Sequence, residues 1–126
     1  MAFLKASTPY DPDHAKTAVI QPTIYDAPPL RKLWSKNIIV CEHGWSLSYS
    51  GSTWRIDTYD YCEEGRQLIL RGEGAAGQMD IFLSAKLFWT NPPNTPLDEE
   101  TSHRVLRNIT VALQWAGYKV GFFSLD

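Results

Sequence analysis

A single amphipathic segment near the C-terminus constrains the fold of this chain most strongly. Its apolar residues recur at spacings of three and four, which is the period of a helix that packs one stripe against a core. These residues are Leu97, Val105, Leu106, Ile109, Ala112, Leu113 and Ala116. Thr95-Pro96-Leu97-Asp98 matches a capping box with proline at the first helical position, and Gly117 follows as a C-cap. The sequence therefore predicts one helix, from about Pro96 to Ala116.

The residues before this helix form short β-type runs divided by glycine. In the clearest run, Trp45, Leu47 and Tyr49 alternate with serines, as expected for a strand with one buried face. We expect a tight turn at Gly51-Ser52, a strand from Thr53, a turn at Glu63-Glu64-Gly65 and a break from Gly72 to Gly77. Further strands are predicted at Ile38–Cys41, Arg66–Arg71, Met79–Leu83 and, after the helix, Tyr118–Phe123.

These elements predict an α+β fold, in which one long C-terminal helix packs on one face of an antiparallel sheet and a final strand follows. We expect five or six strands. A chain of 126 residues supports one core. The first 36 residues hold five of the eight prolines. We therefore divide the chain into a proline-rich N-terminal arm, residues 1–36, and an α+β domain, residues 37–126.

Charge and cysteine content exclude several classes of protein. The net charge of −2 argues against nucleic-acid binding, and the excess of acid lies in residues 57–126, with ten acidic and six basic side chains. The chain has no apolar run long enough to span a membrane and no signal peptide, so we expect a cytoplasmic protein without a membrane partner. In a reducing compartment, Cys41 and Cys62 are expected to be free thiols.

No motif in the chain predicts catalysis, a metal or a cofactor. Cys41, His43 and Cys62 are only three candidate zinc ligands, whereas a structural site needs four. A cysteine nucleophile with His43 or His103 as base would lack a third, orienting group, so we expect no enzymatic activity. The glycines at 72, 74 and 77 are not followed by the helix that a phosphate site requires.

An acidic, tyrosine-rich run is the best candidate for a binding surface. We predict that Trp54, Ile56, Thr58 and Cys62 face one side of this strand, and that Arg55, Asp57, Tyr59 and Tyr61 face water. Tyrosine supplies a large contact area at low entropic cost, and clustered carboxylates attract a basic partner. The predicted partner-binding residues are Asp57, Tyr59, Asp60, Tyr61, Glu63 and Glu64. The alternative is a solvated hairpin whose charges prevent aggregation at a sheet edge.

The order of motifs in the second half of the chain resembles a known family. This order is an acidic turn, Gly65-Arg66-Gln67-Leu68, Gly72-Glu73, Asp80-Ile81-Phe82-Leu83, Trp89, Pro92-Pro93, a capped helix and a final strand. It resembles small immunity proteins of bacterial polymorphic toxin systems, which include contact-dependent, Rhs-type and type VI effector systems. The similarity covers about half of the chain, and residues 1–44 contribute nothing to it.

The resemblance implies a protein that binds and neutralises a cognate toxin domain by covering its active site or substrate surface. Such proteins are monomers or weak dimers without turnover, and the acidic hairpin would mimic an anionic substrate. Two other functions are considered: a structural or assembly subunit that uses Phe122-Phe123 in its final strand, and a small hydrolase that reverses a toxin's modification.

Overall fold

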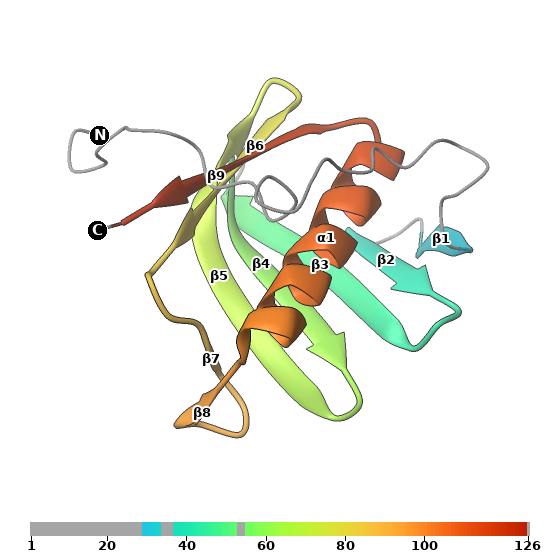
Figure 1. The fold of residues 1–126 in the computed structure, drawn as a ribbon. Coiled ribbons are helices and arrows are strands. Elements are labelled where there is room, and N and C mark those ends of the chain that lie inside the picture. Colours follow the sequence, from blue (N-terminus) through green and yellow to red (C-terminus); the bar gives the residue numbers. More distant parts are fainter. Residues whose placement is uncertain (1–28, 34–36, 53–54, 126) are drawn as a thin grey trace.

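The computed structural model describes residues 29–33, 37–52 and 55–125, which form an α+β fold with one long helix (Figure 1). The main sheet has seven strands, so the predicted count of five or six is too small. In their order across the sheet they are β1 (Leu30–Leu33), β2 (Ile38–Cys41), β3 (Trp45–Ser52), β4 (Arg55–Glu63), β5 (Arg66–Ala75), β6 (Gln78–Leu83) and β9 (Lys119–Ser124). Neighbouring strands are antiparallel except β6 and β9. β9 runs parallel to β6 because the helix carries the chain back across the sheet between them.

The helix α1 (Glu99–Trp115) lies across one face of the sheet, called here the inner face (Figure 1). Its apolar stripe is buried, as its sequence period predicts. The stripe consists of Val105, Leu106, Ile109, Ala112 and Leu113. The opposite face of the sheet is called the outer face.

Both ends of the helix are fixed by local hydrogen bonds. The predicted capping box at Thr95 is wrong, because Thr95–Pro96 forms a short strand, β8, that pairs with β7 (Phe88–Trp89). Asp98 is the N-cap, and its Oδ1 accepts a hydrogen bond of 2.7 Å from the Thr101 backbone N–H. At the other end Gly117, with a φ of +100°, follows the C-cap and ends the helix as predicted.

The strand β5 is longer than its sequence predicts. The expected break from Gly72 to Gly77 is wrong, since Gly72 and Gly74 lie within β5 and the turn comes after Ala75. A Cβ atom added at Gly72 would lie 2.0 Å from the carbonyl oxygen of Asp80 and 2.9 Å from Cε2 of Tyr59. The glycines thus provide space for the Tyr59 ring rather than flexibility.

A bulge in β4 reverses the predicted facing of its residues. Ile56 pairs with Gly51 and Gly74, whereas Thr58 pairs with Ser50 and Arg71. Around Asp57, β4 therefore has one residue more than β3, and β5 has one residue more than β4. One extra residue moves every later side chain to the opposite face. Tyr59 and Tyr61 therefore point to the inner face and are fully buried, so the prediction that they face water is wrong.

The remaining strand predictions have mixed outcomes. Gly51 and Ser52 belong to β3, so the predicted turn there is wrong, and the predicted strand residues Thr53 and Trp54 lie outside the described residues.

Of the predicted arm, Leu30–Leu33 forms the edge strand β1, and the Pro29 carbonyl accepts a hydrogen bond from the Glu42 N–H. Residues 1–28 and 34–36 are not described, and the domain boundary stays a prediction. In the described ranges, no helix is long and apolar enough to cross a membrane.

Candidate protein-binding surface

The six predicted partner-binding residues do not form one surface. Tyr59 and Tyr61 are fully buried beneath the helix and offer no contact area to a partner. Glu63 is 7 % exposed, whereas the side chain of its neighbour Glu64 is 79 % exposed.

The two aspartates of the predicted set lie apart from the tyrosines. Asp57, at the bulge, and Asp60, on the outer face, are both half-buried. Asp60 accepts two hydrogen bonds from Nε2 of Gln67, at 3.1 and 2.9 Å. Its carboxylate is thus engaged within the sheet, and Glu64 is the most exposed of the predicted acids.

Glu63 is the centre of a polar cluster between the sheet and the helix. Its Oε1 accepts a hydrogen bond of 2.7 Å from the Tyr61 hydroxyl, which in turn accepts one of 2.9 Å from Nδ2 of Asn108. Its Oε2 accepts from Arg66 at 2.9 Å and from Arg104 at 2.5 Å. Each hydrogen bond to this buried carboxylate is charge-assisted or comes from a buried donor, so the cluster fixes β4, β5 and α1 to one another.

Aromatic rings enclose this cluster. The Trp45 ring stacks on Tyr61 with ring centroids 5.8 Å apart, and the Arg66 guanidinium lies 4.6 Å from the ring centroid of Trp89. Burial raises the pKa of Tyr61 well above its usual range. The Tyr61 hydroxyl therefore remains a neutral donor to Glu63 over the physiological pH range.

The turn between β4 and β5 projects the exposed carboxylate of Glu64. Glu64 and Gly65 have φ angles of +47° and +76°, the positive values that both central residues of a type I′ hairpin turn require. The turn is held on both sides, because Glu63 precedes it and its ion-pair partner Arg66 follows it. Glu64 is thus an exposed acid on a rigid support.

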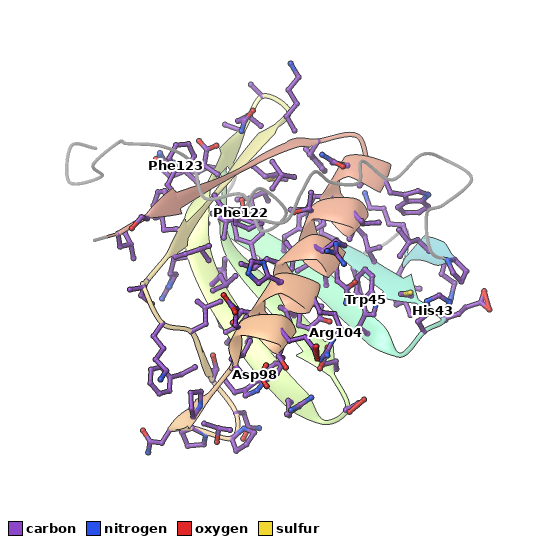
Figure 2. All side chains as sticks on the ribbon, in the orientation of Figure 1. His43, Trp45, Asp98, Arg104, Phe122 and Phe123 are labelled. Carbon is purple, nitrogen blue, oxygen red and sulfur yellow. The ribbon has the colours of Figure 1, made fainter. Side chains whose placement is uncertain are left out.

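Two further acidic segments lie at this end of the sheet. Cys41, Trp45, Glu63 and Arg66 pair in one row across β2 to β5, which places the β2–β3 turn with Glu42 beside the β4–β5 turn. The ion pair between Arg104 and Glu63 brings the start of α1 to the same end. Figure 2 shows Asp98 and Arg104 on the half of the helix beside the β4–β5 hairpin.

We call this surface the acidic end, and define it by its five exposed carboxylates. They are Glu42, Glu64, Asp98, Glu99 and Glu100. Arg66 and Arg104 both bind the buried Glu63, and Arg66 also forms an ion pair of 3.8 Å with the exposed Glu64. Hydrogen bonds from Thr101 lower the pKa of Asp98, so this carboxylate stays charged. The acidic end therefore presents negative charge to a partner.

A shallow, open depression lies beside the two hairpin turns of the acidic end. Its volume is about 290 Å³, and it is lined by Val40, Cys41, Gly44, Trp45, Ser46, Cys62, Glu63, Glu64 and Gly65. A Cβ atom added at Gly44 or Gly65 would meet no atom within 4 Å, so the depression is open to solvent at both turns.

No protein-family model, characterised protein or solved structure matches this chain. The geometry of its own residues therefore carries the argument about function.

A second depression of about 300 Å³ lies at the start of the helix. Its polar lining residues are Ser84, Lys86, Glu99, Ser102 and His103, and its apolar residues include Leu87 and Leu97. This is where His103 and a carboxylate share a concave site, the arrangement that a hydrolase would need. His43, by contrast, lies exposed in the β2–β3 turn, where its backbone N–H donates to Sγ of Cys41 at 3.3 Å.

The two cysteines are free thiols, as predicted. Cys41 pairs with Trp45 in the buried row of the inner face, whereas Cys62 pairs with Ser46 in the next row, whose side chains point to the outer face. Opposite faces of a sheet cannot be joined by one disulfide. Burial and the nearby Asp60 carboxylate raise the pKa of the Cys62 thiol.

Among the described residues, no group of three histidine, cysteine or acidic side chains could hold a metal ion.

The sequence did not predict the acidic end as one surface. Glu42 and the Asp98-Glu99-Glu100 run are visible in the sequence but lie far apart along the chain. Their shared location depends on strand pairing and on the Arg104–Glu63 contact, which local sequence patterns do not specify. The up-and-down order of β2 to β5 would have been the signal, because alternate turns of consecutive antiparallel strands fall at the same end of a sheet.

Proposed function

We propose that this protein is an immunity protein, which binds a cognate bacterial toxin domain stoichiometrically and neutralises it by covering its active site or substrate surface. The observation that supports the proposal is the acidic end, where five exposed carboxylates lie at one end of the sheet, with Arg104 bound to Glu63 and Arg66 shared between Glu63 and Glu64. The motif order that resembles immunity proteins gives the toxin as the class of partner. The expected partner surface is basic.

Charge complementarity explains how such a surface would act. A compact group of carboxylates attracts a basic active-site cleft at long range and raises the association rate. Enzymes that act on anionic substrates such as nucleic acid carry clefts of this kind. The acidic end would occupy the cleft in place of the substrate.

The Glu63 cluster contributes rigidity to the proposed interface. A binding loop that is already ordered in the free protein loses less entropy on association. Glu64 and Gly65 lie between two residues of one ion pair, and that pair is anchored to the helix through Arg104. The turn is thus held in one conformation before any partner arrives.

The experiment is co-expression with the toxin domain encoded beside this chain, followed by purification of the complex and measurement of its Kd. The double variant Glu42→Gln/Glu64→Gln removes two charges from the acidic end. We expect a weaker complex, by about fivefold to a hundredfold for two charges at an interface rim or centre. We also expect a reduced dependence of the association rate on salt.

The matched control removes two charges elsewhere. Glu73 and Asp80 pair with each other across β5 and β6, away from the acidic end, so Glu73→Gln/Asp80→Asn changes the net charge equally. This control should leave the Kd within about twofold. Equal losses in both variants would show a general charge effect and no contact at the acidic end. Absence of any complex, or failure to protect cells, would contradict the proposed function itself.

A small hydrolase that reverses a toxin's modification is the second candidate, because Glu99, Ser102 and His103 line one depression. Its test uses Ser102→Ala and His103→Gln in the same protection assay. Loss of protection with an unchanged Kd for the toxin would favour the hydrolase. Protection that follows the Kd in every variant would favour stoichiometric binding.

A further inference from the structure

Val111 is buried on the face of α1 that points away from the sheet. Each residue of an α-helix is rotated by about 100° from the one before it, so Val111 lies about 200° round the helix axis from Ile109, in the middle of the buried stripe. Val111 is nevertheless only 7 % exposed. Of the buried apolar residues in the described ranges, it is the one that does not belong to the core cluster. Something other than the core therefore covers it.

Neighbouring parts of the described structure do not explain this burial. Arg107 and Trp115, one turn before and one turn after Val111 on the helix, are both exposed. In Figure 1 the helix lies in front of the sheet, and none of the labelled strands crosses its outward face. The cover therefore belongs to residues outside the described ranges.

Of those residues, only the segment before Pro29 is long enough to reach this face of the helix. Residues 34–36 and 53–54 join neighbouring strands within the sheet, and residue 126 follows Leu125, whose N–H bonds to Leu83 at the end of β6. A helix with its side chains is about 10–12 Å across, so a short connection in the plane of the sheet ends well below its far face.

We propose that the N-terminal arm crosses the far face of α1 and that its apolar run, Ala18-Val19-Ile20, covers Val111. The arm enters the described structure at Pro29, directly before the edge strand β1. From there the path passes strands spaced about 5 Å apart and rises past a helix about 10–12 Å thick. Ile20 precedes Pro29 by nine residues, which span about 30 Å when extended, and Tyr25 precedes it by four, which span about 14 Å. The run at residues 18–20 can therefore reach Val111, whereas Tyr25 cannot.

The proposed contact joins two apolar surfaces of one chain. Val111 is buried within a single chain, so its burial requires neither a second copy nor the toxin. Removal of valine and isoleucine side chains from water offsets part of the entropy that the arm loses when it is ordered. The inference is thus independent of the proposed function, and it places part of the arm within the folded domain.

Methyl NMR of the full-length protein tests the contact without any partner. In protein with 13C-labelled isoleucine, leucine and valine methyl groups, we expect NOEs between Val111 and Val19 or Ile20. A soluble paramagnetic agent should relax the Val111 methyls about as slowly as those of Ile109, which has no exposed surface, and more slowly than those of the exposed Ile69. Absence of these NOEs, or relaxation of Val111 as fast as that of Ile69, would overturn the proposal.

Substitutions in the arm test which of its residues provides the cover. Ile20→Ser should raise the paramagnetic relaxation of the Val111 methyls severalfold, because a polar side chain gains little from this contact. Ile20→Val keeps an apolar side chain and should leave the relaxation unchanged. The matched control Ile24→Ser makes the same change closer to Pro29 and should also leave Val111 shielded. Equal effects of Ile20→Ser and Ile24→Ser would contradict the assignment to residues 18–20.

A mixture of labelled and unlabelled chains tests whether the cover comes from the same molecule. The proposal predicts that the NOEs to Val111 arise within labelled chains and that isotope-filtered spectra of the mixture show none between chains. NOEs between labelled and unlabelled chains would assign the cover to a second copy and overturn the proposal. The measurements on the wild-type protein decide the question even where a substitution in the arm prevents folding.

Discussion

Two adjacent glutamates in the β4–β5 hairpin have opposite environments. The Glu63 side chain is 7 % exposed and binds two guanidiniums and a tyrosine hydroxyl, whereas the Glu64 side chain is 79 % exposed. Local sequence does not distinguish them, because both belong to the same Glu-Glu-Gly turn. Their difference comes from the strand row that directs Glu63 beneath α1. Glu63 is thus part of the support for the acidic end, and Glu64 is part of its surface.

Isosteric amides at these two positions should separate stability from binding. We expect Glu63→Gln to lower the free energy of unfolding by about 1–3 kcal/mol, because charge-assisted hydrogen bonds to a buried group are lost. Glu64→Gln should change it by less than about 0.5 kcal/mol, as is usual for surface substitutions. Urea denaturation followed by tryptophan fluorescence measures both values. Equal losses for the two variants would contradict the structural role of Glu63.

Three buried tyrosines should make stability sensitive to alkaline pH. Burial raises the pKa of Tyr49 to about 12 and raises the pKa values of Tyr59 and Tyr61 further above their usual range. Because the unfolded chain ionises first, near pH 10, their stabilising contribution is complete below that pH. It is lost as the pH rises through the folded-state values.

We therefore expect the free energy of unfolding to be level up to about pH 9 and to fall from about pH 10 upwards. Denaturation curves between pH 7 and 11.5 measure this dependence. The Tyr59→Phe variant should show a shallower decline, because Tyr59 donates only to Sδ of Met79, at 3.4 Å, and its removal abolishes one ionisation. An identical slope in the variant would show that Tyr59 ionises equally easily in both states.

At the scale of single elements, β4 and β5 depend on each other. The bulge at Asp57 turns Tyr59 inwards, and the glycines at 72 and 74 in β5 leave space for its ring. Larger residues at these two positions would collide with the inward-facing Tyr59 ring, and glycines opposite an outward-facing Tyr59 would have no packing role. The two irregularities thus form one packing unit.

Substitution at Gly72 should disrupt this unit. We expect Gly72→Ala to lower the free energy of unfolding by about 3 kcal/mol or more, because its Cβ would lie 2.0 Å from the Asp80 carbonyl oxygen, a backbone atom. The neighbouring variant Arg71→Ala, at an exposed position, should cost less than about 1 kcal/mol. Thermal unfolding of both proteins provides the comparison. A stable Gly72→Ala variant would mean that β5 and β6 can separate at this point without loss.

At the scale of the whole molecule, one face of the sheet holds the core and one end holds the charge. The core lies between α1 and the middle strands, where Ile39, Leu47 and Ile109 have no exposed surface. The short strands β1, β7 and β8 pair along few residues, and only Trp89 of β7 and Leu30 of β1 reach the core from them. The described elements therefore differ in the free-energy cost of local unfolding, which is lower for strands that pair along few residues.

Hydrogen exchange should reveal this gradient. We expect the amides of β3, β4, β5 and α1 to exchange slowest, through global unfolding, and those of β1, β7 and β8 to exchange at least about a hundredfold faster. Peptide-level exchange followed by mass spectrometry measures both groups in the free protein. On binding of the toxin domain, added protection should appear at residues 42–44 and 63–66. Protection confined to the outer face would place the interface elsewhere.

Local sequence patterns determined the fold class, the helix with its glycine end, and the approximate positions of β2, β3, β5, β6 and β9. Periodicity and glycine placement act through backbone geometry within a few residues, so they can be read without a structure. Only the tertiary structure decided which face each residue of β4 occupies and which acids meet at one end. A one-residue bulge at Asp57 is set by pairing with strands on both sides, and it reverses every side chain that follows.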